Sequence, residues 1–156
     1  MNLSKHLTLF EMTRSETAKR KGVSNEPTPE HIENMKVLAE KIFEPIRKNF
    51  GVPIYLSSGY RSAALNKKIN GAKNSYHLYG MAMDLDQDGS KNGITNKEIF
   101  DFIKDNLLFT ELIWEFGTNK NPDWVHVAYD SKKLNKEILI AKKTLIGTKY
   151  TKFTWY

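Results

Sequence analysis

Apolar residues recur with helical spacing in the first third of the chain. Between residues 29 and 50 an apolar side chain returns at every third or fourth position, which is the period of an amphipathic helix. Thr28 fits its N-cap, Pro29 its first residue and Gly51 its end. We expect this helix to carry the main core, with some strain at Pro45, which has no backbone N–H to donate.

Shorter helices are expected around this one. Capping boxes, in which Ser or Thr is followed three residues later by Glu, open at Thr13 and at Thr95, and each predicts the start of a helix. Gly22 fits the end of the first of these helices. A further short helix is predicted over residues 62–70, with Gly71 closing it.

The rest of the chain is more typical of strands. Short runs rich in apolar and β-branched residues occupy residues 54–57, 81–86, 111–116 and 124–129. The last two runs are joined by the turn-like residues 117–122, which predicts a hairpin. Helices gathered in one part and strands in another are typical of the α+β class. We therefore expect one α+β domain over residues 1–156, with a small, mainly antiparallel sheet flanked by helices.

The composition is that of an ordinary globular domain. Of the 156 residues, 40% are hydrophobic and 27% are charged, which is enough apolar surface for a core and argues against disorder. There is no cysteine. A disulfide framework and a thiolate metal site are therefore excluded, and histidine and carboxylate remain as ligands for a metal.

Positive charge is concentrated near the C-terminal end. Residues 131–156 contain seven lysines against one acid, Glu137, so their excess of six equals the net charge of the chain, +6. This basic segment fits a solvated lysine face best, and the alternative is a contact surface for an anionic partner, whether nucleic acid, a membrane or an anionic wall polymer. Nucleic acid is not an expected partner, because no nucleic-acid motif accompanies the charge.

Candidate chemistry is found in two short apolar strands. Asp84 lies in the first, where a carboxylate needs a partner and a metal ion is a strong one. Gly80 allows the chain to turn, so that His77 comes back over the same face. His126 is an imidazole in the second strand and, taken alone, would more often be a satisfied core residue. If the strands are neighbours, these ligands leave a fourth position open, which is the catalytic form of a zinc site.

Three motifs follow one another along the chain. They are Ser58-Gly59-Tyr60-Arg61-Ser62, Ser75-x-His77-x-x-Gly80-x-Ala82-x-Asp84 and Trp124-Val125-His126-Val127. In this order and spacing they resemble the D-alanyl-D-alanine carboxypeptidase superfamily of zinc peptidases, and most of all its short branch that includes phage L-alanyl-D-glutamate endolysins. The resemblance runs over residues 9–129. It implies the zinc peptidase fold shared with D-Ala-D-Ala carboxypeptidases and hedgehog-like domains.

By that resemblance, His77, Asp84 and His126 are the ligands of a Zn²⁺ ion. The general base of the superfamily lies three residues before its last histidine ligand, a position held here by Asp123. Many carboxypeptidase members carry Glu there and endolysin-like members can carry Asp, which favours the endolysin branch. Such a base takes a proton from the attacking water and hands it to the leaving amine. Without the resemblance, Asp123 would be interpreted as a turn residue after Pro122.

Other charged residues are candidates around this site. Arg61 lies on a Gly-Tyr-Arg-Ser turn, where its guanidinium can pair with a substrate carboxylate or a developing oxyanion, and a structural ion pair is the alternative. Glu115 is a rival base, but a supporting position behind the metal ligands fits it better. Asp86 and Asp88 resemble part of a calcium-binding EF-hand loop, but Thr95 occupies the position where that loop needs glutamate. An EF-hand is therefore rejected, and weak binding of a secondary cation by Asp86 and Asp88 is the remaining alternative.

The resemblance implies hydrolysis of the peptidoglycan stem peptide, with the bond between L-alanine and D-glutamate preferred. D-alanyl-D-alanine carboxypeptidase activity and a zinc-containing wall-binding module without activity are the alternatives. The first 13 residues hold no apolar stretch of signal-peptide or membrane-span length. We expect a monomer without a membrane span, made in the cytoplasm and acting on the cell wall, with phage-type release as one route to it.

Overall fold

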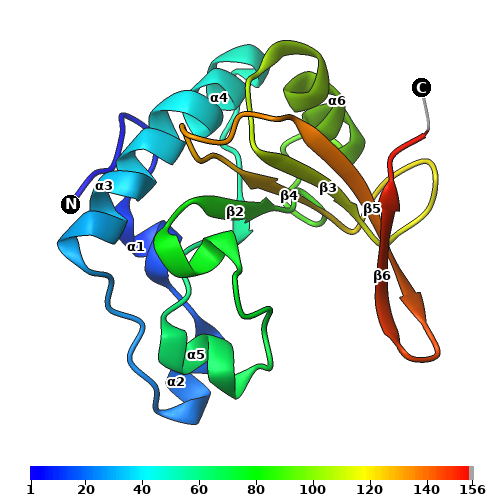
Figure 1. Cartoon of the computed structure of the whole chain (residues 1–156). Coiled ribbons are helices and arrows are strands. Elements are labelled where there is room, and N and C mark those ends of the chain that lie inside the picture. Colours follow the sequence, from blue (N-terminus) through cyan, green and yellow to red (C-terminus); the bar gives the residue numbers. More distant parts are fainter. Residues whose placement is uncertain (155–156) are drawn as a thin grey trace.

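Within residues 1–154, which the computed structural model describes, a six-stranded sheet forms the central layer (Figure 1). The strands are β1 Leu56–Ser58, β2 Ala82–Leu85, β3 Glu111–Glu115, β4 Trp124–Ala128, β5 Glu137–Thr144 and β6 Gly147–Lys152. They lie in the order β1-β2-β4-β3-β5-β6, and neighbours are antiparallel except for the parallel pair β3 and β5. The expected α+β fold with a mainly antiparallel sheet is confirmed.

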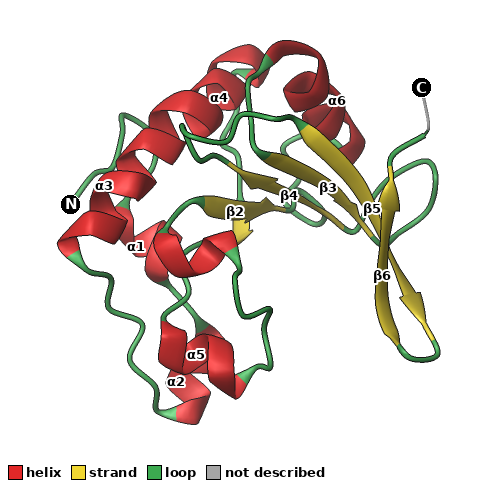
Figure 2. Ribbon diagram, in the orientation of Figure 1, coloured by secondary structure: helices red, strands yellow, loops and turns green. Residues whose placement is uncertain are grey.

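The helices gather in different places around the sheet (Figure 2). One group covers a face of the sheet and consists of α3 Pro29–Leu38, α4 Glu44–Phe50 and α6 Asn96–Asn106. The other lies towards β1 and consists of α1 Leu9–Thr13, α2 Glu16–Lys21 and α5 Ala63–Lys68. Among the described residues, no helix has the length and apolar character needed to cross a membrane.

The long helix expected over residues 29–50 is present but interrupted. A π-helical turn, Ala39–Phe43, separates α3 from α4. It comes directly before the first turn of α4, which contains Pro45. Because Pro45 has no N–H, the regular hydrogen-bond ladder cannot pass through this point, and the wider turn takes up the break. The buried side of the helix still carries the core as expected, with Leu38, Ile42, Phe43 and Ile46 at most 1% exposed.

The helix starts follow the capping rules, with one correction. Ser15, not Thr13, caps α2, and its hydroxyl accepts a hydrogen bond from a backbone amide of the first turn. Thr13 is instead the last residue of α1, a short helix that was not predicted. A capping box formed by Thr8 and Glu11 opens α1. Thr95 caps α6 as predicted.

The basic segment 131–156 contains a hairpin that was not predicted. Its first strand, β5, extends the sheet by pairing with β3, and residues Ile140 and Ala141 are buried there. Its second strand, β6, pairs with β5 and is exposed along its whole length. The tip carries Leu145 and Ile146 fully in solvent. β5 was not predicted because the segment is rich in lysine and the strand is apolar only where it pairs with the sheet.

The faces of the sheet have opposite characters. On the face towards the long helices, Met83, Trp114 and Val125 are at most 1% exposed and belong to the core. Side chains alternate along each strand, so the residues between them point the other way. There the register sets Asp84 on β2 directly opposite His126 on β4. The sheet therefore buries the core on one face and presents ionisable side chains on the other.

Candidate metal centre

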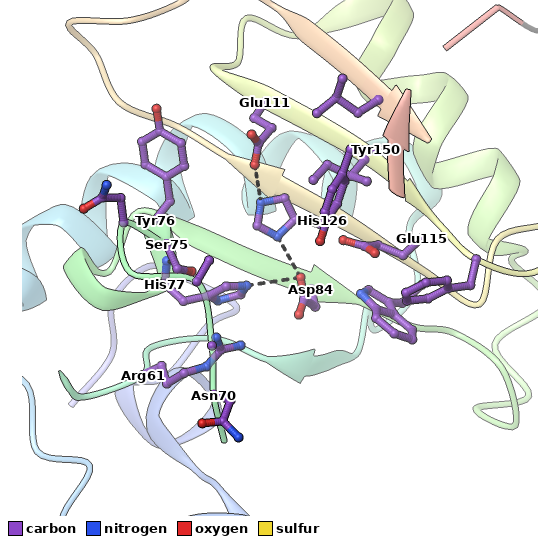
Figure 3. A pocket seen from close by; sticks show the side chains of 17 residues that line it. Arg61, Asn70, Ser75, Tyr76, His77, Asp84, Glu111, Glu115, His126 and Tyr150 are labelled. Carbon is purple, nitrogen blue, oxygen red and sulfur yellow. Dashed lines mark hydrogen bonds and ion pairs between the residues drawn. The ribbon is translucent and has the colours of Figure 1, made fainter. Parts of the chain in front are cut away.

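Asp84, His77 and His126 converge on the open face of the sheet (Figure 3). His77 lies in the 3-10 helix Tyr76–Tyr79, which precedes β2. Asp84 Oδ1 is 3.0 Å from His126 Nδ1 and 3.3 Å from His77 Nε2. The structure thus brings together the three residues predicted as metal ligands, which we call the trio.

The spacing of the trio fits a zinc ion. In a tetrahedral site with bonds of about 2.0–2.1 Å, neighbouring ligand atoms lie about 3.3 Å apart. Ligand atoms of the trio all lie within 4.8 Å of one another, and no other such group of His, Asp and Glu occurs among residues 1–154. The side chains of His77, Asp84 and His126 are only 5%, 13% and 9% exposed. Two imidazoles and one carboxylate match the protein ligands of a catalytic site, which keeps a fourth position open.

Each imidazole is held by the nitrogen that faces away from Asp84. His77 Nδ1 lies 2.6 Å from the carbonyl oxygen of Gly59, so it donates a hydrogen bond and leaves the lone pair of Nε2 towards the centre. His126 Nε2 lies 2.9 Å from Glu111 Oε1, which leaves Nδ1 towards the centre. Partners of this kind fix the orientation of metal-binding histidines and raise their basicity.

Glu111 is a site residue that was not predicted. It opens β3, where Glu111, Ile113 and Glu115 face the same side because side chains alternate. Two glutamates on one face of an otherwise apolar strand were the available indication in the sequence. The register partner of Glu111 on β4 is Ala128, whose small side chain leaves room for the carboxylate to reach His126.

Gly80 determines where His77 lies. It ends the 3-10 helix in the left-handed region, with a φ of 72°. A Cβ atom at this position would lie 2.6 Å from the carbonyl oxygen of His31 in α3. The turn predicted at Gly80 is confirmed, and its close contact with α3 needs a residue without a side chain. This contact holds the 3-10 helix, and with it His77, beside β2.

The ionisable groups of the trio balance one another's charge. Burial acts to lower the pKa of His126, but hydrogen bonds to Asp84 and Glu111 outweigh it and raise the pKa to about 10. Burial likewise disfavours the charged form of Asp84, yet the charge of His77 and hydrogen bonds to both imidazoles hold the pKa of that carboxyl well below its usual range. A cation is thus favoured at this position, either a proton on His126 or a metal ion.

Glu115 points into the cavity around the trio (Figure 3), whereas Asp123 is not among the residues that line this cavity. Glu115 ends β3, is 7% exposed and lines the same cavity as the trio. Asp123 instead lines a separate hollow beside Lys142 and Lys143. Asp123 was expected as the base at the metal and Glu115 in a supporting position, and which of the two carboxylates is the base stays a prediction.

The backbone before β4 explains this difference. Asp123 N donates a hydrogen bond to Glu115 O at 2.9 Å, and Asp123 O accepts one from the buried Asn96 side chain at 3.0 Å. Asp123 itself lies at a bend directly before β4, which begins at Trp124. Its backbone is thus held between β3 and α6, and its side chain lines the hollow beside Lys142 and Lys143 and not the cavity of the trio.

The environment of Glu115 suits a group that exchanges protons. Burial raises its pKa to about 7, with the charge of His126 opposing and the charges of Asp84 and Glu111 adding to the rise. A carboxyl group with a pKa near neutral pH can both accept and return a proton.

Arg61 lies on the other side of the trio from Glu115 (Figure 3). Its Nη1 donates to Asn66 Oδ1 at 3.2 Å, and its backbone N donates to the carbonyl oxygen of His77 at 3.1 Å. Burial lowers the pKa of Arg61, and the charge of Asp84 opposes this. The guanidinium is held at the cavity wall and has further N–H donors for a carboxylate.

Asp86 supports the loop after β2. Its Oδ1 accepts hydrogen bonds from Asp88 N and from Asn96 Nδ2, each at 3.0 Å. Burial raises the pKa of Asp88, and the charges of Asp86 and Asp123 add to the rise. These contacts give Asp86 a structural role next to α6.

The trio lies in a cavity of about 630 Å³ whose walls differ in chemistry. One wall is polar and comes from Arg61 and the loop of residues 70–76. The other is aromatic and aliphatic and comes from Phe116, Trp124, Leu139 and Tyr150. Burial raises the pKa of Tyr150, and the charges of Glu115, Glu111 and Asp84 add to the rise.

Comparison with known proteins gives one family. The sequence model of the peptidase M15 family matches residues 5–128, a segment that contains the trio, Arg61 and Glu115. No curated protein matches the chain. The family match spans well over half of the sequence and confirms the resemblance indicated by the three motifs. The chain is therefore a member of the peptidase M15 family, zinc peptidases of the D-Ala-D-Ala carboxypeptidase superfamily.

Proposed function

We propose that the protein is a zinc-dependent peptidase that cleaves the peptidoglycan stem peptide between L-alanine and D-glutamate. The observation that carries this proposal is one cavity, in a peptidase M15 member, where the trio meets Glu115 and Arg61. The trio would hold zinc, which when bound supplies Lewis-acid chemistry and activates water. The choice of bond rests on the resemblance of the three motifs to the short endolysin branch.

Glu115 is the general base in this proposal. It takes a proton from the attacking water and later gives that proton to the amine of the leaving fragment, so the carboxylate returns to its starting state. Its place on the cavity wall supports this role, whereas Asp123 would have to leave its present position to act. A wall-binding module without activity would have no use for a buried carboxyl group here.

Arg61 binds and orients the substrate. A stem peptide carries carboxylates, and the planar guanidinium can hold one of them by paired hydrogen bonds. The carboxylate of D-glutamate lies next to the proposed scissile amide, so this contact would position the amide beside Glu115. The position of Arg61 across the trio from Glu115 supports such an arrangement (Figure 3).

The basic hairpin is the proposed contact with an anionic wall polymer. Its lysines are exposed and lie on both strands, namely Lys142, Lys143, Lys149 and Lys152. Such charge would concentrate a monomeric enzyme on the cell wall after it leaves the cytoplasm. Binding to walls that retain their anionic polymer should weaken as salt is added, and binding to stripped walls should be weaker from the start.

Digestion of purified peptidoglycan, with products identified by mass spectrometry, tests the proposed bond. We expect stem peptides that begin with D-glutamate, with L-alanine left on the glycan strands. Release of D-alanine alone, with L-alanyl-D-glutamate bonds intact, would instead identify a D-alanyl-D-alanine carboxypeptidase. Saturable wall binding without any cleavage would identify a binding module. The His126→Ala variant, which lacks one ligand of the trio, is the matched inactive control.

A further inference from the structure

The hairpin β5–β6 lies outside the segment that the family model matches, yet it reaches the candidate site. The match ends at residue 128, and the hairpin spans residues 137–152. Leu139 from β5 and Tyr150 from β6 line the same cavity as the trio. This wall of the cavity is therefore an addition to the segment that defines the family.

The register of the sheet explains how Tyr150 reaches the site. Glu115 on β3 pairs with Ala141 on β5, and Ala141 pairs with Tyr150 on β6. Register partners project from the same face of a sheet, and strands lie about 4.8 Å apart, so the backbones of Glu115 and Tyr150 are about 10 Å apart. Ala141 between them is buried and has a small side chain, so larger side chains on either side can extend over it. The Tyr150 side chain points across this space towards Glu115 and His126 (Figure 3).

The hairpin is anchored next to Tyr150. Phe153, directly after β6, packs its ring against Phe100 and Trp114, with centroid distances of 4.9 Å and 6.0 Å. Its backbone N also donates to the carbonyl oxygen of Ile138 at 3.0 Å. This anchor to the core holds β6 in place, although the strand itself is exposed.

Tyr150 has the properties of a ligand-binding residue. It is 54% exposed, so its ring and hydroxyl are accessible from the cavity. Over residues 1–154 its hydroxyl makes no hydrogen bond, which leaves its donor for a bound molecule. It faces Arg61 across the trio (Figure 3). A peptide lying between them would meet a cation on one side and an aromatic hydroxyl on the other.

We propose that the hairpin β5–β6 forms the second wall of the substrate cleft and that the Tyr150 hydroxyl donates a hydrogen bond to a carbonyl oxygen of the bound stem peptide. The inference rests on the proposed function for the identity of the ligand. The Tyr150 ring packs along the peptide backbone, and Arg61 holds the carboxylate on the opposite wall. Tyr150 thus contributes to the choice of substrate from outside the family segment.

A binding measurement separates this inference from catalysis. The variant Glu115→Gln, loaded with zinc, is titrated calorimetrically with the synthetic tetrapeptide L-Ala-D-Glu-L-Lys-D-Ala. Adding Tyr150→Phe should raise the Kd about 5- to 10-fold, the loss expected for one hydrogen bond. Adding Tyr55→Phe, which changes an exposed tyrosine outside the cavity, should leave the Kd within about twofold of the parent. Zinc content and Tm should be the same in all three proteins.

Each outcome bears on one proposal or on both. A Kd for the Tyr150→Phe protein within twofold of the parent would overturn the role of Tyr150. Equal losses in the Tyr150→Phe and Tyr55→Phe proteins would overturn it as well. Tetrapeptide binding that depends on Tyr150, but without cleavage by the wild-type chain, would contradict only the proposed hydrolysis. Failure of the parent to bind the tetrapeptide would contradict both.

Discussion

A backbone hydrogen bond joins Asp123 to Glu115, but the two side chains line different cavities. We expect Glu115→Gln to keep zinc and fold while the rate of hydrolysis falls about 10²–10⁴-fold, because the amide cannot accept the proton. Asp123→Asn should change the rate no more than a few-fold. Steady-state kinetics on a stem peptide, with zinc measured in each protein, compares the two. Full activity of Glu115→Gln together with an inactive Asp123→Asn would return the role of base to Asp123.

Glu111 acts on the metal through His126. Removing the charge of the carboxylate that holds His126 Nε2 should weaken zinc binding about tenfold or more, since partners behind a metal ligand typically contribute 10–100-fold. We therefore expect Glu111→Gln to lose zinc to a chelating dye at lower dye concentrations than the wild type. Glu137→Gln is the matched control, because Glu137 is the register partner of Glu111 on β5 but does not line the cavity. Equal zinc affinities in all three proteins would contradict the role of Glu111.

The raised pKa of His126 predicts that zinc and a proton compete for the site. The pKa is about 10 in the folded chain, against about 6.5 for a free histidine. The contact of protonated His126 with Asp84 and Glu111 therefore stabilises the metal-free fold fully below pH 6.5. This contribution to stability is lost as the pH rises through 10. Zinc needs the neutral imidazole, so its apparent affinity should rise with pH until the pH passes the folded pKa of about 10. Calorimetry in buffers of different ionisation enthalpy should show about one proton released from His126 per zinc at pH 8, and a heat independent of the buffer would argue against it.

The three residues of the trio could be predicted from the sequence, whereas most of the residues around them could not. Asp84 and His126 are ionisable residues in apolar strands, His77 comes shortly before the first of these strands, and the motif spacing predicted that the three lie together. Glu111 and Glu115 look ordinary in the sequence, since a glutamate at either end of a strand is common. Only the pairing of β3 with β4 shows that both face His126.

At the scale of elements, the 3-10 helix before β2 depends on Gly80. Gly80→Ala should destabilise the fold by more than the roughly 1–2 kcal/mol that a side chain costs in the left-handed region, because its Cβ would meet His31 O at 2.6 Å. Zinc affinity should fall with it, as His77 moves. Gly89→Ala is the control, since Gly89 has a similar φ of 77° but open space around it. Urea unfolding of both variants measures the difference, and equal losses would show that the contact with α3 is unimportant.

Helices and strands with a one-sided apolar pattern were predicted well. The interrupted helix of residues 29–50 and α6 bury one face, and β3 and β4 are short apolar strands that are buried over most of their length. The hairpin of β5 and β6 escaped prediction because only its first strand contacts the core, over a few residues, and lysines dominate the remainder. Its place in the sheet depends on parallel pairing with β3, which no local pattern encodes.

In the molecule as a whole, the hydrophobic core and the candidate site lie on opposite faces of one sheet. The core lies between the sheet and the long helices, and the cavity lies on the other face. Substitutions in the cavity therefore remove few core contacts. This separation allows variants of Glu115, Glu111 and Tyr150 to be compared as folded proteins.

The most direct test of the zinc peptidase is a metal titration followed by hydrolysis. Zinc is added in steps to the metal-free protein, and cleavage of a synthetic stem peptide is measured at each step. We expect no cleavage without metal and a rise that reaches its plateau at one zinc per chain, because one trio supplies one site. His126→Ala should stay inactive throughout the same titration. Cleavage by the metal-free protein at the full rate, or a zinc-loaded wild type that cuts no stem peptide, would contradict the proposed function.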